Sequence, residues 1–177
     1  GLAEVIKYGV ISDRYLFELL EQNLEKILAL DRELLTQIIV RSCENKVRVV
    51  EADEREDDYR AVLNFGHTIG HALEAATGYR QFLHGEAVAI GMVKAAALSV
   101  QQGFCDPRSF ERITRLIKKA GLPTEFPPGM SVSSLVQGME VDKKATAGQI
   151  KFVISEGLGK TRFHWLAPGE ILDALGG

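Results

Sequence analysis

The chain has 177 residues and a formal net charge of −3, with 46% hydrophobic and 25% charged residues. This length suffices for one domain with a proper core or for two very small ones, and the composition is ordinary for a globular protein. The charge balance gives no reason to expect nucleic acid or an anionic membrane as a partner.

The two cysteines, Cys43 and Cys105, are too few for a disulfide framework and lack metal-ligand spacing. They indicate reduced thiols, and no signal peptide or membrane-spanning apolar run is present, so we expect a cytoplasmic protein. The chain enters helix-forming sequence at once, with Gly1 where an intact protein has its initiating Met. We therefore expect a piece of a longer protein whose partner domain is missing.

The first third of the chain is predicted to be helical. Ser12 or Asp13 can cap a helix that carries apolar residues at helical spacing. Asp31 precedes a longer periodic apolar run over residues 34–50. Residues 51–58 are strongly acidic and lack large apolar side chains, so we expect a solvated loop or a fraying helix end there.

The middle of the chain contains two predicted helices that carry most of the candidate chemistry. The first covers residues 61–77, with Gly78 as its C-cap. Its Gly66 and Gly70 indicate close packing against a neighbouring helix. The second covers residues 84–102 and is apolar nearly all round, which is typical of a buried central helix.

The last third adds a helix over residues 107–121 and then changes its hydrophobic period to two. Residues 150–154 and 161–166 flank a glycine-containing turn and predict a β-hairpin, in which His164 is a half-exposed strand residue. We predict a mainly α fold, a single helical domain over residues 1–177 with one small β-hairpin. The chain has no glycine-rich phosphate motif, so a nucleotide site would lie mostly in the missing part.

Three of the four histidines lie between positions 67 and 84. His67 and His71 are four residues apart, so they share one face of a helix. Thr68 stands where the metallopeptidase motif requires Glu, which argues against a peptidase. His84 lies at a predicted helix start and can fold back onto the preceding helix. Imidazole is the commonest metal ligand, so this cluster predicts a metal site, an acid/base site, or both.

A catalytic zinc site needs three protein ligands and an open position. Two imidazoles and one carboxylate would meet this need, with Glu4, Glu74 and Glu86 as the candidate carboxylates. Spacing alone chooses neither among these carboxylates nor between His67 and His71.

Several basic residues could bind an anionic substrate beside such a metal. Arg binds carboxylate or phosphate with two parallel hydrogen bonds, and Lys binds phosphate as a point charge. For any single residue, the default interpretation is a solvated surface charge. The residues in question are Lys7, Lys46, Arg60, Lys143 and Lys144.

One polar stripe would connect these groups to the histidines. Arg60 lies one helical turn before Asn64, and Asn64 lies one turn before His67. If the helix begins early enough, these residues and His71 form a continuous polar face, which favours an active-site surface.

Five segments of the chain together resemble the 3-dehydroquinate synthase family, and the central histidine motif is highly specific. The resemblance covers essentially the whole chain as the C-terminal metal- and substrate-binding domain, without the family's N-terminal NAD-binding domain. The segments are Gly1–Lys7, Glu44–Lys46, Leu63–Ala72, Leu83–Val88 and Asp142–Lys144.

The resemblance implies a reaction of the shikimate pathway. The substrate would be 3-deoxy-D-arabino-heptulosonate 7-phosphate and the product 3-dehydroquinate. NAD transiently oxidises a ring hydroxyl, which acidifies the neighbouring proton, so that phosphate is eliminated. NADH then returns the hydride, the ring opens, and an intramolecular aldol step closes the carbocycle.

The resemblance also assigns roles to residues of this chain. A zinc or cobalt ion would be held by Glu4, His67 and His84, which leaves His71 as a polar group beside the substrate. Lys46 and Arg60 would hold the substrate carboxylate. Catalytic roles fall to His71, Lys7 and Asn64, and the phosphate would face Asn64, His71 and a lysine of the pair Lys143 and Lys144.

Three alternatives stand beside this resemblance, and the presence of both Lys46 and Arg60 supports the dehydroquinate branch over the first of them. Related sugar-phosphate cyclases that make aminocyclitols share the fold and the metal triad, but their substrates lack the carboxylate that Lys46 and Arg60 would bind. A non-catalytic helical module with a structural metal and a metal-dependent alcohol dehydrogenase are the others. We expect the family's usual homodimer for the intact enzyme and no turnover from this chain alone.

Overall fold

The computed structural model describes residues 1–53, 59–142 and 148–176. Within these ranges the backbone forms mainly α-helices and one antiparallel hairpin, which confirms the predicted fold class. The elements are α1 (Leu2–Ile11), α2 (Arg14–Leu28), α3 (Arg32–Asp53), the 3₁₀ helix η1 (Tyr59–Asn64), α4 (His67–Ala76), α5 (His84–Gln101), α6 (Pro107–Lys119), α7 (Val132–Asp142), β1 (Ile150–Ser155), β2 (Thr161–Leu166) and α8 (Pro168–Gly176).

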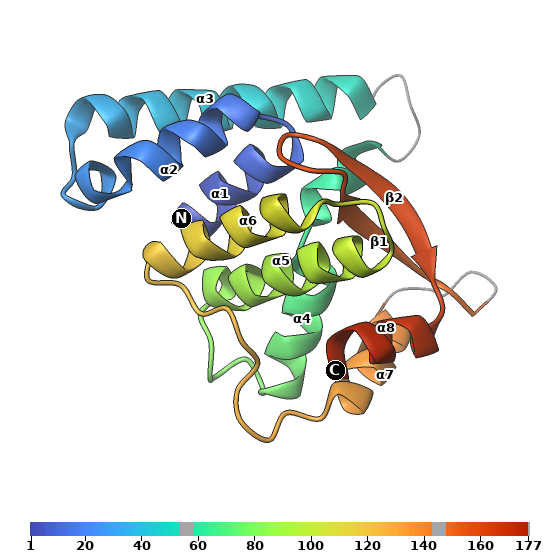
Figure 1. The fold of residues 1–177 in the computed structure, drawn as a ribbon. Helices are drawn as coiled ribbons and strands as arrows, with labels where there is room; N and C mark the ends of the chain where they lie inside the picture. The colour runs from blue at the N-terminus through green and yellow to red at the C-terminus, as the bar shows by residue number, and fades with distance from the viewer. Residues whose placement is uncertain (54–58, 143–147, 177) are drawn as a thin grey trace.

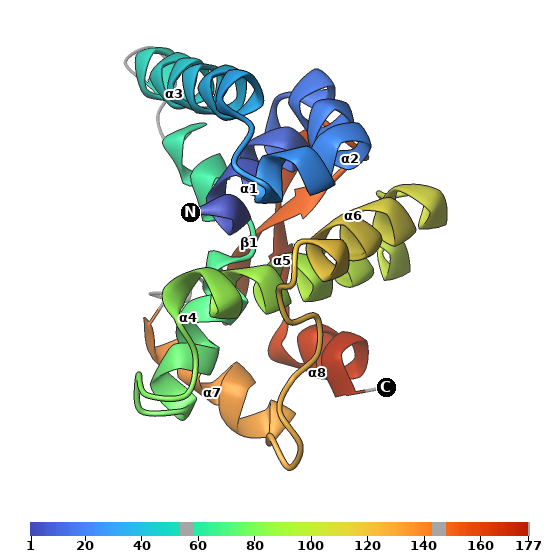
Figure 2. The same ribbon diagram turned by 90° about the vertical axis from the view of Figure 1, so that its left-hand side faces the viewer.

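Helix α5 forms the centre of the molecule, as its apolar sequence predicts. Helices α1, α4, α6 and α8 and strand β1 all pack against it. In Figures 1 and 2, α1, α2 and α3 lie above α5, whereas α4, α7 and α8 lie below it. The hairpin packs against α5 through β1 and covers one side of the molecule.

Helices α4 and α5 approach each other closely because glycines remove side chains from their contact. A Cβ atom at Gly70 would lie 3.2 Å from the backbone of Ala87, and one at Gly91 would overlap the carbonyl oxygen of Gly66. The packing role expected for Gly66 and Gly70 is therefore confirmed. This contact sets the first turn of α5 beside α4 and so brings their histidines together.

The boundary of the histidine helix differs from the prediction of residues 61–77. Gly66 has φ = +79°, so the backbone leaves helical geometry at this point. A Cβ at Gly66 would lie 2.6 Å from a side-chain atom of Met92, so the position also has no room for a side chain. Helix α4 consequently begins at His67, after the separate 3₁₀ helix that carries Arg60 and Asn64. The predicted continuous polar stripe on one helix is therefore wrong.

Helix α3 is one uninterrupted helix that continues to Asp53, within the acidic stretch. Asp31 accepts a hydrogen bond from the backbone N–H of Leu34 at 3.0 Å, as a capping residue does. Ile38 and Val49 face the core, whereas the outer side of the helix leaves other apolar residues exposed, among them Ile39, Val47 and Val50.

The predicted hairpin forms with Ile150 paired to Leu166 and Phe152 paired to His164. His164 is half-buried, with its ring 4.9 Å from that of Phe104, which agrees with a structural strand residue. Both cysteines are free thiols. Across the part of the chain that the structure describes, no helix combines the length and the apolar character needed to cross a bilayer.

Candidate metal centre

Three imidazole rings meet where α4 and α5 begin. His67 is the first residue of α4, His71 lies one turn further along, and His84 is the first residue of α5. The ring centroids of His67 and His84 are 5.4 Å apart, those of His67 and His71 are 5.5 Å apart, and those of His71 and His84 are 5.9 Å apart. The structure thus brings together all three histidines of the predicted cluster.

Helix α1 supplies a carboxylate to this cluster. Oε1 of Glu4 lies 3.4 Å from Nε2 of His67. One ligand atom from each of Glu4, His67 and His84 can be chosen so that all three lie within 4.8 Å of one another. Oε1 of Glu4 is buried and has no hydrogen-bond partner among the described residues, although such oxygens are nearly always paired.

The protonation of His67 explains why that oxygen is unpaired. Nδ1 of His67 lies 3.2 Å from the carbonyl oxygen of Phe65, which only accepts, so Nδ1 carries the proton. Burial, together with the nearby charge of Lys7, lowers the pKa of His67 to about 4. The ring is neutral near pH 7, and its Nε2 presents a lone pair to a carboxylate oxygen that also presents lone pairs. A cation between the two atoms would satisfy both.

The donor set suits zinc or cobalt. Neutral imidazole nitrogen and carboxylate oxygen are ligands that both ions accept, and three such groups leave a position open for substrate. The unpaired oxygen of Glu4 is the observation that fits a cation here.

The other two candidate carboxylates have different surroundings. Oε2 of Glu86 accepts a hydrogen bond from the backbone N–H of Leu83 at 2.8 Å and so caps the start of α5. Glu74 is buried on α4, and its Oε1 lies 3.2 Å from Nδ1 of His84. Together with His71 and His84, Glu74 forms a second group whose ligand atoms lie within 4.8 Å of one another.

Lys7 lies one turn after Glu4 and is only 3% exposed. Its Nζ donates a hydrogen bond of 2.7 Å to Oε2 of Glu4. Burial lowers the pKa of Lys7, the bond to Glu4 opposes this, and the charge of Lys46 lowers it further. The charge of Lys46 therefore acts on Lys7 from the neighbouring helix α3, although Lys46 itself is exposed.

The remaining predicted substrate residues lie outside this buried group. Arg60 and Asn64 are exposed on η1, which packs against α1 and α3 and leads directly into α4. The backbone N–H of Arg60 donates to Oδ1 of Asp53 at 3.1 Å. Lys143 and Lys144 lie outside the described residues.

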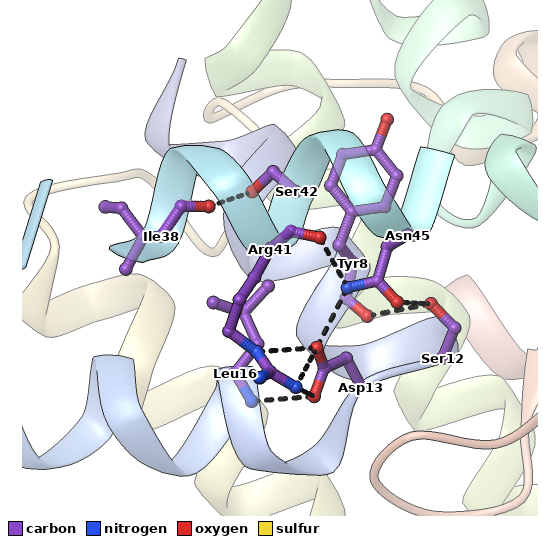
Figure 3. A network of polar contacts seen from close by, with 8 residues as sticks. All are labelled: Tyr8, Ser12, Asp13, Leu16, Ile38, Arg41, Ser42 and Asn45. Atoms are coloured by element: carbon purple, nitrogen blue, oxygen red, sulfur yellow. Dashed lines mark hydrogen bonds and ion pairs between the residues drawn. The ribbon is translucent and has the colours of Figure 1, made fainter. Parts of the chain in front are cut away.

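A polar network between α3 and the junction of α1 and α2 was not anticipated from the sequence (Figure 3). Arg41 on α3 donates to both oxygens of Asp13, with its shortest contact at 2.8 Å. Asn45 donates to Oδ2 of Asp13 at 2.9 Å and accepts from the hydroxyl of Ser12 at 3.1 Å. The capping signal at Asp13 is local and was found, whereas its partners on α3 are distant in sequence and carry no local signal.

Comparison with known proteins agrees with this architecture. The family model described as the C-terminal part of 3-dehydroquinate synthase matches residues 1–145. The chain belongs to the 3-dehydroquinate synthase family.

Two bacterial 3-dehydroquinate synthases match nearly the whole of this chain over about half of their own length. The 3-dehydroquinate synthases of Thermodesulfovibrio yellowstonii and of Caldanaerobacter subterraneus subsp. tengcongensis are each 50% identical over 175 residues. The matches cover 99% of this chain and 49% of each relative. The chain thus spans about half the length of the curated relatives that it matches.

Two solved structures share the fold. A 2-epi-5-epi-valiolone synthase from Streptomyces hygroscopicus, with NAD⁺ and Zn²⁺ bound, superposes with a TM-score of 0.86 at 23% identity, covering 98% of this chain and 49% of that one. A 2-deoxy-scyllo-inosose synthase, in complex with carbaglucose-6-phosphate, NAD⁺ and Co²⁺, gives a TM-score of 0.81 at 22% identity, covering 100% and 51%.

Proposed function

We propose that this chain is the metal- and substrate-binding half of a 3-dehydroquinate synthase, with residues 1–177 acting as one domain. The intact enzyme would be a carbon–oxygen lyase that converts 3-deoxy-D-arabino-heptulosonate 7-phosphate into 3-dehydroquinate and phosphate. Family membership and relatives of that name at 50% identity support this proposal. The observation that carries it is the unpaired oxygen of Glu4 beside His67 and His84.

The reaction is redox-neutral overall. The hydride that leaves the substrate for NAD⁺ returns to it from NADH. The net change is cleavage of a carbon–oxygen bond with release of phosphate, followed by ring opening and formation of a carbon–carbon bond in the intramolecular aldol step. The NAD site would lie mainly in the half of the enzyme that the chain does not span. Bound NAD⁺ in two proteins of the same fold is consistent with this assignment.

Glu4, His67 and His84 would hold the metal ion. When bound, a zinc or cobalt ion supplies a Lewis acid that polarises and orients substrate hydroxyl groups. One of the two solved structures of this fold contains Zn²⁺ and the other Co²⁺. The neutral ring of His67 supports its role, because a protonated imidazole cannot bind a metal.

The anionic ends of the substrate would be held by residues around this site. We assign the carboxylate to Lys46 and Arg60, because guanidinium and ammonium groups suit that anion. This pair favours the dehydroquinate synthases over the related cyclases that act on substrates without a carboxylate. The phosphate would face His71, Asn64 and one of Lys143 and Lys144.

Catalytic roles fall to three residues with different surroundings. The ring of His71 is exposed beside the other two imidazoles, where it can exchange protons with substrate. The buried ammonium of Lys7 would contact substrate in a poorly hydrated environment, where its charge acts strongly. Asn64, exposed on η1, would orient the phosphate. The intact enzyme would be a cytoplasmic homodimer.

Zinc titration by calorimetry tests the ligand assignment. We expect the wild-type chain to bind one zinc ion, His84→Ala to abolish binding, and His71→Ala to leave it nearly intact. If His71→Ala abolishes binding instead, the metal uses the histidine pair on α4 and the ligand assignment fails.

A chimeric enzyme tests the reaction itself. The C-terminal half of the Thermodesulfovibrio yellowstonii synthase would be replaced by this chain, which is 50% identical to it. We expect NAD-dependent release of phosphate and formation of 3-dehydroquinate, and no turnover in the matched His84→Ala chimera. A folded, zinc-loaded wild-type chimera without activity would refute the proposed function.

A further inference from the structure

Glu74 is a buried carboxylate next to the proposed metal site. It lies on α4, one turn after His71, and is 9% exposed. Its Oε1 and Oε2 lie 3.2 and 3.4 Å from Nδ1 of His84. A buried carboxylate requires strong partners, so this contact matters for both residues.

The contact determines which nitrogen of His84 carries the proton. A carboxylate accepts hydrogen bonds and donates none, so Nδ1 of His84 must be the protonated nitrogen. In the neutral ring Nε2 then has a free lone pair, the form that binds a metal. The side chain of His84 is 52% exposed, so its ring has few packing contacts that could hold this orientation.

We propose that Glu74 is a positioning residue that holds His84 in its metal-binding tautomer, with Nε2 directed at the site shared with Glu4 and His67. Metal-binding histidines commonly donate their second ring N–H to a carboxylate in this way. The inference rests on the proposed function, because it presumes that His84 binds the metal.

The alternative role for Glu74 is direct ligation together with His71 and His84, whose ligand atoms also lie close together. Two observations favour positioning. Both oxygens of Glu74 already face the protonated nitrogen of His84, whereas Oε1 of Glu4 lacks a hydrogen-bond partner in the described part of the chain. Ligation by Glu74 in place of Glu4 would also leave the buried Oε1 of Glu4 without a cation beside it.

Zinc calorimetry on Glu74→Ala and Glu74→Gln distinguishes the two roles. The amide oxygen of Gln can still accept from Nδ1–H of His84, so we expect Glu74→Gln to retain most of the zinc affinity. Glu74→Ala should lower the affinity about 10- to 100-fold, the usual effect of losing such a partner. A loss in Glu74→Gln as large as in Glu74→Ala would show that Glu74 is a ligand and would overturn the proposal.

Glu21→Gln is the matched control, because this half-buried carboxylate pairs with Arg112 between α2 and α6, away from the histidines. We expect its zinc affinity to equal that of the wild type. A loss comparable to that of Glu74→Ala would mean that removal of any paired carboxylate weakens the site, which would contradict a specific role for Glu74.

Nitrogen NMR of the histidine rings gives a readout that needs no metal. In the metal-free chain, His84 should be protonated at Nδ1 in the wild type and in Glu74→Gln, and should become a mixture of tautomers in Glu74→Ala. An unchanged tautomer in Glu74→Ala would overturn the proposal. A failure of the proposed function would give a different result. In that case His84→Ala would bind zinc as tightly as the wild type, whichever nitrogen of His84 carries the proton.

Discussion

Lys7 has the environment least expected of its residue type. An ammonium group is rarely buried, yet Lys7 is 3% exposed and pairs with a glutamate that remains 36% exposed. Burial costs the charged form its hydration and lowers the pKa of Lys7, which the bond to Glu4 only partly offsets. Such a cost to the fold is typical of a residue retained for function.

Replacement of Lys7 by the similarly long Met tests this interpretation. We expect Lys7→Met to change the free energy of unfolding by less than about 1 kcal/mol or to raise it, because the side chain of Glu4 is 36% exposed and so is not left as a fully buried charge. The same change should abolish turnover in the chimeric enzyme. Urea unfolding measures the first effect, and a loss above about 2 kcal/mol would mean that the pair with Glu4 stabilises α1.

At the level of elements, the contact between α4 and α5 determines where His67 and His84 lie. Gly91 on α5 has no room for a side chain, since a Cβ would overlap the carbonyl oxygen of Gly66 and lie 3.0 Å from the backbone nitrogen of Gly70. The two helices can relieve this overlap only by moving apart, which would also separate the two histidines.

The substitution Gly91→Ala should therefore destabilise the protein by about 2 kcal/mol through overpacking and should weaken zinc binding. Gly138→Ala on α7 is the matched control, because a Cβ there meets none of the described residues within 4 Å. That change should be neutral or stabilise the helix by about 0.5 kcal/mol. Thermal unfolding and zinc titration of both variants check this prediction. Equal effects of Gly91→Ala and Gly138→Ala would contradict it.

The network around Asp13 fixes α3 against the junction of α1 and α2 (Figure 3). Asp13 caps α2 through the N–H of Leu16 and also binds Arg41 and Asn45. Lys46 follows Asn45 on α3, so the network also holds the helix that carries this proposed substrate residue.

Two capping aspartates with different partners test the contribution of this network. Asp13→Ala should cost about 3 kcal/mol, because it removes a cap and leaves the half-buried Arg41 and the buried Asn45 without the carboxylate that they bind. Asp31→Ala removes only an exposed cap and should cost about 1 kcal/mol. Equal losses in urea unfolding would contradict a special role of the network.

The same network predicts an acid dependence of stability. Burial alone would raise the pKa of Asp13, but hydrogen bonds from Asn45, Leu16 and Arg41 and the charge of Arg41 hold it below its ordinary value. A carboxyl with a lowered folded-state pKa stabilises fully above its unfolded pKa of about 4, and this stabilisation is lost as the pH falls through the folded value.

Comparison with Asp13→Asn, whose side chain does not ionise, isolates this effect. We expect the difference in free energy of unfolding between wild type and Asp13→Asn to be largest near neutral pH. It should shrink when urea unfolding is repeated at about pH 3. A difference that stayed constant would show that the charge of Asp13 is not what stabilises the network.

At the scale of the whole molecule, the chain spans about half the length of its relatives and lacks a glycine-rich nucleotide motif. We expect the 177-residue chain to fold and bind zinc but to show no turnover with substrate and NAD⁺, because we propose that the NAD site lies mainly in the other half of the enzyme. A coupled assay for phosphate release checks this. Turnover from the purified chain would refute the assignment of the NAD site to the other half.

The sequence by itself determined the helical class, the hairpin and the cap at Asp13, because these depend on neighbours a few residues apart. It also marked the histidine cluster as the candidate site of chemistry. The break in the helix at Gly66, which separates Asn64 from His67, was not predictable from the sequence. It accompanies the close approach of Met92, and that approach depends on how α5 packs.

Only the tertiary structure separated the roles of the three candidate carboxylates. Glu4, Glu74 and Glu86 are chemically equivalent in sequence, yet one faces His67 without a partner, one binds His84 and one caps α5. These differences arise because α1, α4 and α5, although separate in sequence, pack around one point. The role of a carboxylate depends on which donors the fold places within hydrogen-bonding distance, and spacing along the chain does not encode that.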